Sequence, residues 1–286
     1  MGRANGKSDM KKVVLLDIDN TITPPRQPLT ETMANILDRL NIPFHVVAGS
    51  HIGLLKDQFF EPLYEFGFRK GFDAFLSNGA IHYRCDYSKE MSIEVISSFN
   101  IRDYLGVTDY NFLIEVLKKG LELQDMKLPD SLKVFGEAIT FRESMINFTP
   151  IGRSIIEDLD VQQNRKKFVE FDHAHAYRQK MMNYLKRELA ILIRKRELTI
   201  TLGGQTSFDI GIVGQDKTKA VRTFLGMGTE KIFFIGDALY EGGNDAVIRE
   251  FFEQWPPQSP CPLELIQISS WQETVKIFFE LGFIDE

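Results

Sequence analysis

The sequence predicts an α/β protein: a parallel β-sheet flanked by helices, with an α+β module inserted into the middle of the chain. Residues 13–16 form a short all-apolar run and residues 44–48 a mostly apolar one, both typical of strands buried on both faces, and a helical pattern over 30–40 separates them. A strand, a helix and a strand in this order imply a right-handed crossover and parallel pairing. This pattern returns after residue 211, whereas strands and helices alternate less regularly over 89–210.

The other elements follow in chain order from the spacing of apolar residues, which recur every three or four positions in helices and form short runs in strands. In the outer parts of the chain we expect helices over 52–60, 217–225 and 274–281 and strands over 75–77, 231–236 and 265–268. In the middle we expect helices over 112–121 and 174–192 and strands over 138–148 and 198–202. The predicted domains are therefore a core formed by 1–88 and 211–286 and an inserted domain formed by 89–210.

The composition narrows the possible functions. The chain has 286 residues and a net charge of −6, which allows a packed core and argues against a general nucleic-acid binder. Its two cysteines, Cys85 and Cys261, lack metal-ligand spacing and fit a reducing compartment. No apolar run approaches membrane-spanning length, and residues 1–10 lack the apolar stretch of a signal peptide. We therefore expect a cytoplasmic protein without a membrane partner.

The stretch KVVLLDIDNTITP, residues 12–24, places two carboxylates directly after a predicted strand. Asp17 and Asp19 would lie at the carboxyl end of a parallel strand, where open α/β sheets bind their ligands. Carboxylates this close repel each other unless a cation is bound, and hard oxygen ligands favour Mg²⁺. With a metal in place, Asp17 could attack phosphorus and Asp19 could give a proton to the leaving oxygen. The alternative is that Asp-x-Asp is a solvated turn.

Two single residues could assist such a reaction. Ser50 follows the strand expected over 44–48 and could donate to a phosphate oxygen, although a serine in this place is often only a turn or a helix cap. Lys217 opens a predicted helix and could neutralise phosphoryl charge near Asp17. The alternative for any single lysine is a solvated surface position.

The stretch IGDALYEGGND, residues 235–245, is more specific. Asp237 ends a buried strand, and two glycines allow the backbone to turn back before Asp245. We expect Asp237 to be a further metal ligand and Asp245 to bind the metal or to support its ligands. A solvated loop is the alternative.

DIDNTIT resembles the first motif of the haloacid dehalogenase (HAD) superfamily of phosphoryl-transfer enzymes, whose usual form is DxDGT. Asn20 stands where that pattern commonly has Gly, and Asn tolerates the left-handed backbone conformation better than most residues. Ser50, Lys217 and residues 235–245 match the later motifs of the superfamily in kind and order. The resemblance implies a HAD-like Rossmannoid core with a parallel sheet and an inserted α+β cap domain of type IIB.

The inserted module resembles one family within this superfamily, the eukaryotic-type phosphomannomutases. The similarity lies in FRESMINFTPIGRS at 141–154, in Arg165, in GGQTSFDI at 203–210 and, outside the module, in TPPRQ at 23–27. The family usually has Lys-Thr after the aspartate of its fourth motif, where this chain has Ala238-Leu239. The first half of the module, residues 89–135, resembles the family only weakly.

This resemblance implies a phosphomannomutase that interconverts mannose 6-phosphate and mannose 1-phosphate through a phosphorylated aspartate and a hexose bisphosphate. Asp17 would carry the phosphoryl group and Asp19 would be the general acid/base, assisted by Ser50 and Lys217. The implied Mg²⁺ ligands are Asp17, Asp19, Asp237 and Asp245. The implied substrate-binding residues are Arg26, Arg142, Arg153, Arg165, Ser207 and Asp209, because guanidinium groups bind phosphate oxygens bidentately. The implied partners are hexose phosphates and, through the cap, a second copy of the chain.

Two other functions stay open on the sequence alone. A sugar-phosphate phosphatase of the same fold would use the same motifs with water as the acceptor, so only the arginine set argues against it. A non-catalytic binding protein on this scaffold would not need the catalytic carboxylates, which are all present. The sequence does not distinguish mannose from glucose phosphates, because the two sugars differ at one hydroxyl.

Overall fold

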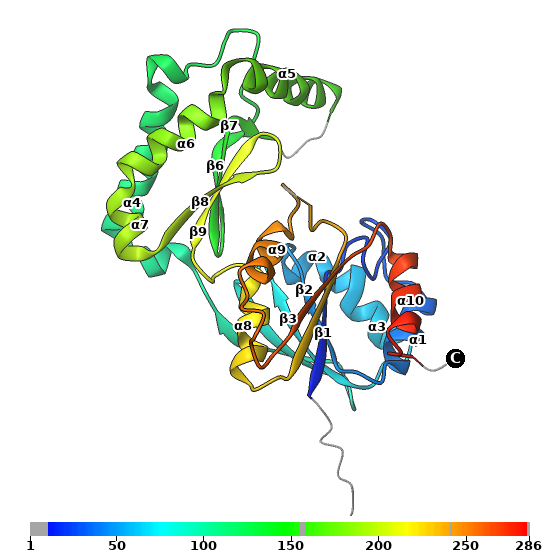
Figure 1. Cartoon of the computed structure of the whole chain (residues 1–286). Coiled ribbons are helices and arrows are strands. Elements are labelled where there is room, and N and C mark those ends of the chain that lie inside the picture. The colour runs from blue at the N-terminus through cyan, green and yellow to red at the C-terminus, as the bar shows by residue number, and fades with distance from the viewer. Residues whose placement is uncertain (1–10, 155–157, 241, 285–286) are drawn as a thin grey trace, which may run out of the picture. The chain divides into compact units, whose positions relative to one another are not determined.

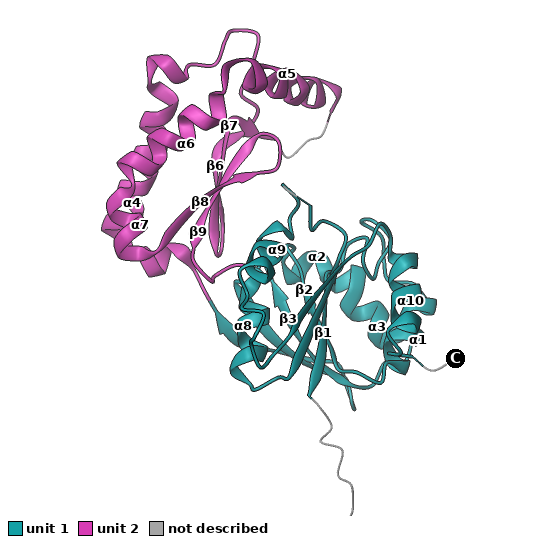
Figure 2. Cartoon of the chain, in the orientation of Figure 1, with its two compact units in different colours: residues 1–98, 217–286 teal, residues 99–216 magenta. Residues whose placement is uncertain are grey.

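The structure is a computed structural model that describes residues 11–154, 158–240 and 242–284. The chain forms two compact units, coloured separately in Figure 2. Unit 1 combines Met1–Ser98 with Lys217–Glu286, and unit 2 is Phe99–Asp216. Each unit has a sheet and an apolar core of its own.

Unit 1 is built on a seven-stranded sheet with the strand order β11-β10-β1-β2-β3-β4-β5. The strands are β1 (Lys12–Leu16), β2 (Phe44–Val47), β3 (Gly71–Leu76), β4 (Ile81–Asp86), β5 (Ser92–Ser98), β10 (Lys231–Gly236) and β11 (Leu263–Gln267). The strands from β11 to β3 run parallel, and β4 and β5 continue the sheet in antiparallel pairing. The predicted parallel α/β sheet is confirmed.

Helices cover both faces of this sheet (Figure 1). They are α1 (Glu31–Arg39), α2 (Ile52–Leu55), the π-helical segment η1 (Lys56–Phe60), α3 (Glu61–Glu65), α8 (Thr218–Gly226), α9 (Ala246–Glu253) and α10 (Trp271–Glu280). One face packs against α1, α2, η1, α3 and α10, and the other face packs against α8 and α9. The sheet is therefore the middle layer of three.

Strand β1 lies inside the sheet and is apolar along most of its length because both of its faces are covered. Its residues alternate between the core beneath α1 and the core beneath α8. Leu16, the last residue of β1, pairs with Val46 on β2 and with Ile235 on β10. The loops that follow these three parallel strands therefore leave the sheet at the same edge, where ligand sites of such sheets form.

Unit 2 is an α+β structure around a four-stranded antiparallel sheet with the order β6-β7-β9-β8. The strands are β6 (Glu137–Arg142), β7 (Met145–Arg153), β8 (Leu198–Gly203) and β9 (Ser207–Ile212). The helices are α4 (Ile101–Glu122), the 3-10 turn η2 (Gln124–Met126), α5 (Leu159–His175), α6 (Tyr177–Glu188) and α7 (Ala190–Arg196). In the described parts of the chain, no helix combines the length and the apolar character that a membrane crossing requires.

The two faces of the unit 2 sheet differ in polarity. Ile146 and Phe148 of β7 are fully buried in the core formed with the helices of this unit. Because side chains alternate along a strand, Asn147 lies on the opposite face, and it pairs with Asp209 on β9. One face of the sheet thus packs against the apolar core of unit 2, and the other face carries polar side chains.

The compact units begin and end at other residues than the predicted domains, which were 1–88 with 211–286 and 89–210. Strand β5 is hydrogen-bonded to β4 in the sheet of unit 1, so Ser92–Ser98 belongs to the core. Strand β9 is paired with β7 and β8 up to Ile212, so its last residues belong to unit 2, which ends at Asp216. Hydrogen bonding between strands, which the apolar pattern does not reveal, assigns β5 to unit 1 and the whole of β9 to unit 2.

Two helices of unit 2 also differ from the prediction. The helix expected over 174–192 is divided among α5, α6 and α7, because Ala176 adopts a left-handed conformation (φ 50°) between the first two. The sequence has no Gly or Pro there to indicate a break. The helix expected over 112–121 is the second half of α4, which has a kink at Gly106 (φ 71°).

A buried polar network joins β2, β3 and β4 in unit 1. The Oδ1 atom of Asp73 lies 3.0 Å from His82 Nε2 and accepts a hydrogen bond from Arg84 Nη2 at 3.1 Å. The backbone N–H of Asp73 donates to His45 Nδ1 at 3.0 Å. Burial alone would raise the pKa of Asp73, but the imidazoles and the Arg84 guanidinium outweigh it and hold that pKa well below the usual range. Burial lowers the pKa of His45, which favours its neutral form.

We expect Asp73→Asn to lower the free energy of unfolding at pH 7 by about 2–4 kcal/mol, because it removes the charged partner of a buried network. Since the folded pKa of Asp73 is depressed, its contribution is present above the unfolded value of about 3.9 and is lost as the pH falls through the folded value. Urea unfolding at pH 7 and at about pH 2.5, below the unfolded value, with the exposed carboxylate variant Glu90→Gln as control, measures this. Equal unfolding midpoints for Asp73→Asn and wild type at pH 7 would contradict the prediction.

Candidate active site

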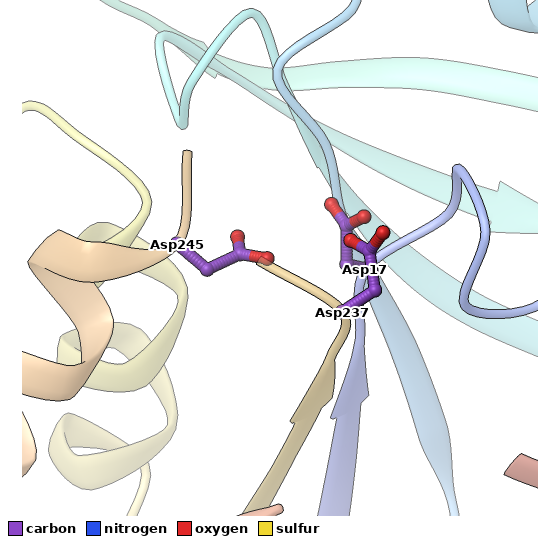
Figure 3. Close-up of side chains that lie close together, drawn as sticks. All are labelled: Asp17, Asp237 and Asp245. Atoms are coloured by element: carbon purple, nitrogen blue, oxygen red, sulfur yellow. The ribbon is translucent and has the colours of Figure 1, made fainter. Parts of the chain in front are cut away.

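Three carboxylates gather where β1 and β10 end and α9 begins. Asp17 follows β1, Asp237 follows β10 and Asp245 precedes α9. One oxygen from each lies within 4.8 Å of the others, and Figure 3 shows the three side chains around a common space. The sheet register explains the meeting of Asp17 and Asp237, because Leu16 and Ile235 are paired neighbours just before them.

Lys217 lies fully buried among these carboxylates. Its Nζ donates to Asp17 Oδ1 at 2.9 Å and to Asp245 Oδ1 at 2.5 Å. Burial alone would lower the pKa of Lys217, but the two carboxylates outweigh burial and raise it, so the ammonium stays charged. The pKa of Asp17 is raised to about 7. Burial is the main cause and the negative charge of Asp245 adds to it, whereas Lys217 lowers this pKa.

The residues fit a metal ion. Asp245 is fully buried, and its Oδ2 has no hydrogen-bond partner among the described residues. One ammonium cannot balance three carboxylates, so the cluster favours a further positive charge. Its donors are all carboxylate oxygens, which suit a hard divalent cation. Asp17, Asp237 and Asp245 could therefore hold such an ion together.

Glycines allow the loop between β10 and α9 to bring Asp245 back to the cluster. A Cβ atom on Gly243 would lie 2.0 Å from the carbonyl oxygen of Ala238, so only glycine fits there. A Cβ atom on Gly236 would lie 2.8 Å from Asp245 Oδ2. The backbone N–H of Asp245 closes the turn by donating to the Ala238 carbonyl at 3.1 Å.

Asp19 does not join the carboxylate cluster, although the sequence placed it among the metal ligands. It is exposed, and its Oδ1 accepts a hydrogen bond from the backbone N–H of Arg26 at 2.6 Å. The turn after β1 explains the separation: the N–H groups of Thr21, Ile22 and Thr23 all donate to the Ile18 carbonyl, so the chain curls away from the strand direction.

The loops after β1 and β2 hold the other predicted residues of unit 1. Arg26 has a left-handed backbone (φ 55°) and an exposed side chain. Ser50 is half-buried beyond the carboxyl end of β2, and its carbonyl accepts the N–H of Ser77 at 2.9 Å. Asn20 also has a left-handed backbone (φ 57°), and its Nδ2 donates to Asp237 Oδ2 at 2.9 Å.

The remaining predicted substrate residues line one pocket of about 320 Å³ in unit 2. Its lining consists of Arg142, Asn147, Arg153, Arg165, Gly203, Gly204, Gln205, Thr206, Ser207 and Asp209. Three guanidinium groups and one carboxylate give this pocket a positive balance, which suits an anion. Arg26 belongs to unit 1 and is not part of the lining.

A chain of hydrogen bonds orders the floor of the arginine pocket. Thr149 Oγ1 donates to Asn147 Oδ1 at 3.0 Å, and Asn147 Nδ2 donates to Asp209 Oδ1 at 2.7 Å. Burial raises the pKa of Asp209, while the Asn147 hydrogen bond and Arg153 oppose the rise. A Cβ atom on Gly203 would lie 2.7 Å from both Asp209 Oδ1 and Ser207 Oγ, so the β8–β9 turn needs glycine to leave room for the pocket.

Sequence reasoning missed several residues of these two sites. Asn147, Gln205 and Thr206 line the pocket, and Asn20 contacts the carboxylate cluster. The signal for Asn147 was present: it is a polar residue between Ile146 and Phe148 in an otherwise apolar strand. The contact of Asn20 with Asp237 spans 217 positions in the sequence, and no local pattern indicates it.

Comparison with known proteins agrees with this architecture. A model of the eukaryotic phosphomannomutase family matches residues 29–254, a range that begins after Asp17 and Asp19. Phosphomannomutase 2 of Dictyostelium discoideum is 33% identical over 236 residues, which cover 82% of this chain and 84% of the relative. A phosphomannomutase of Triticum aestivum is 31% identical over 256 residues, which cover 87% and 89%.

A solved structure supports the fold. A phosphatase of the haloalkanoate (HAD) enzyme superfamily from Bacteroides thetaiotaomicron matches 99% of both chains with a TM-score of 0.52 and 15% identity. The HAD-like fold class predicted from the sequence is confirmed by this likeness together with the observed sheets. From the family match and the relatives at this level of identity, the chain belongs to the eukaryotic phosphomannomutase family.

Proposed function

We propose that this protein is a phosphomannomutase that interconverts mannose 6-phosphate and mannose 1-phosphate through a phosphorylated Asp17 and a hexose bisphosphate. The arginine-lined pocket of unit 2 carries the proposal beyond simple phosphate release. A bisphosphate has two phosphates to bind, and each unit holds groups suited to one of them. Glucose phosphates are candidate substrates as well, because they differ from mannose phosphates at one hydroxyl.

The proposed cofactor is Mg²⁺, held by Asp17, Asp237 and Asp245. Two observations support it: the oxygen atoms of the three carboxylates lie together, and the buried Asp245 Oδ2 has no hydrogen-bond partner among the described residues. When bound, the ion would draw negative charge from the phosphoryl oxygens. Lys217 donates hydrogen bonds to Asp17 and Asp245, which keeps both in place, and adds a positive charge next to the proposed nucleophile.

The proposed reaction uses Asp17 as the carrier and Asp19 as the acid/base. The phosphoryl group on Asp17 passes to a hydroxyl of the hexose monophosphate, so the bond from Asp17 oxygen to phosphorus breaks as the sugar oxygen bonds to phosphorus. Asp19 takes the hydroxyl proton. The bisphosphate then presents its other phosphate, Asp17 attacks that phosphorus, and Asp19 returns the proton to the sugar oxygen that leaves.

The pocket of unit 2 would bind the phosphate that is not reacting. Arg142, Arg153 and Arg165 line it, and guanidinium groups bind phosphate oxygens with paired hydrogen bonds. Ser207 and Asp209 line the same pocket and would bind sugar hydroxyls or assist with the phosphate. Asn147 would hold one oxygen of Asp209 and leave the other to accept a hydroxyl.

We expect the wild-type protein to produce mannose 6-phosphate when it is supplied with Mg²⁺, mannose 1-phosphate and a hexose bisphosphate activator. A coupled enzymatic assay measures the mannose 6-phosphate formed. Asp17→Asn should abolish conversion, because an amide is too weak a nucleophile to accept the phosphoryl group. A parallel assay for inorganic phosphate separates the alternatives. Release of phosphate without mannose 6-phosphate would identify a phosphatase, and no turnover in either assay would identify a non-catalytic protein.

Arg153→Ala should lower kcat/KM about 10–100-fold, because one charge-assisted phosphate contact contributes about 1.5–3 kcal/mol. Arg153→Lys should recover part of the loss, since it restores the charge but not the paired hydrogen bonds. The matched control is Arg187→Ala on α6. Arg187 is exposed, its Nε lies 2.8 Å from Glu188 Oε1, and it is not part of the pocket lining. Steady-state kinetics in which Arg153→Ala behaves like Arg187→Ala would contradict the assignment.

Removal of divalent metal with EDTA should stop turnover, and added Mg²⁺ should restore it. Because Mg²⁺ would bind the folded chain only, at 100 times its Kd it should add about 2.7 kcal/mol of stability. Thermal unfolding with and without Mg²⁺ measures this, with Asp245→Asn as the variant that should lose most of the increase in Tm. Full activity in EDTA would refute the metal assignment.

A further inference from the structure

Asn20 makes a direct link between the loop after β1 and the carboxylate cluster. Its Nδ2 donates to Asp237 Oδ2 at 2.9 Å and reaches the carbonyl oxygen of Ser269 at 3.3 Å. Its left-handed backbone (φ 57°) is a conformation that favours glycine, and glycine is the residue that the DxDGT motif commonly has there. A glycine at this position would allow the same turn but would have no side-chain amide.

Asp237 needs such a partner more than the other two carboxylates of the cluster. Asp17 and Asp245 are nearly or fully buried and both accept hydrogen bonds from Lys217. Asp237 is only half-buried, and the side-chain hydrogen bonds of that ammonium within the described residues go to Asp17 and Asp245. The two residues after it, Ala238 and Leu239, have side chains without hydrogen-bond donors. The Asn20 amide therefore supplies a donor from a distant loop.

The amide engages one oxygen of Asp237 and thereby affects how this carboxylate can bind a cation. A cation that takes both oxygens of Asp237 would compete with the amide for Oδ2, whereas a cation that takes one oxygen would not. Mg²⁺ requires a near-octahedral arrangement at short distances, while Ca²⁺ has a flexible geometry and often takes both oxygens of a carboxylate. Restraint by the amide thus favours the smaller ion.

We propose that Asn20 is a positioning residue of the metal site, which holds Asp237 for one-oxygen coordination and so raises the preference for Mg²⁺ over Ca²⁺. This inference rests on the proposed Mg²⁺ site. Groups that orient metal ligands typically change metal affinity about 10–100-fold when they are removed. The effect of Asn20 is therefore large enough to measure directly.

The test is calorimetric titration of wild type and Asn20→Gly with MgCl₂ and, separately, with CaCl₂. Asn20→Gly keeps the left-handed turn without strain and removes only the amide. We expect the Kd for Mg²⁺ to rise about tenfold and the Kd for Ca²⁺ to rise less or to fall, so that the ratio of the two constants changes. Binding of metal is measured without turnover, so the result does not depend on catalysis.

Thr274→Val is the matched control, because Thr274 Oγ1 donates to the Thr21 carbonyl at 2.7 Å and thus anchors the same loop through a different hydrogen bond. It should leave the ratio of Mg²⁺ to Ca²⁺ affinity unchanged. An unchanged ratio in Asn20→Gly, or an equal change in Thr274→Val, would overturn the role of Asn20 alone. Wild type that binds no Mg²⁺ would instead overturn the metal site on which this role rests.

Discussion

The buried ion-pair network around Lys217 is the interaction on which the rest of unit 1 depends. Lys217 is the first residue after the inserted unit, and it bonds to Asp17, which lies 200 positions earlier, and to Asp245 at the start of α9. Burial of these charges has a large desolvation cost, which is offset only while the ammonium and the carboxylates stay in contact. The same contacts that align the proposed nucleophile therefore also join the two segments of the chain that form the core.

Much of the core could be predicted because its strands are buried on both faces. Complete burial requires an apolar residue at every position, so β1 and β10 stand out in the sequence, and the aspartates that end them stand out equally. The β4–β5 hairpin escaped prediction because β5 is exposed along most of its length and mixes polar with apolar residues. Strand pairing, not composition, assigns it to the sheet.

The parts of the site that the sequence could not give depend on turns and on contacts between distant residues. Asp17 and Asp19 are two positions apart, which would place them on one face of a strand, but the chain has already curled around the Ile18 carbonyl. The contact between Asn20 and Asp237 depends on where the loops after β1 and β10 meet in space. By contrast, the arginine set was found from a family resemblance, and the structure gathers three of its four members in one pocket.

Strand β7 combines two functions along a single stretch of backbone, since alternate residues support the core of unit 2 and the lining of the pocket. Deletion or insertion of one residue inside it would exchange the two sets, turning Ile146 and Phe148 outward and forcing Asn147 into the apolar layer. Changes of length are therefore tolerated best in the connecting loops of this unit, whereas point substitutions on the polar face can alter the lining of the pocket without disturbing the packing beneath it.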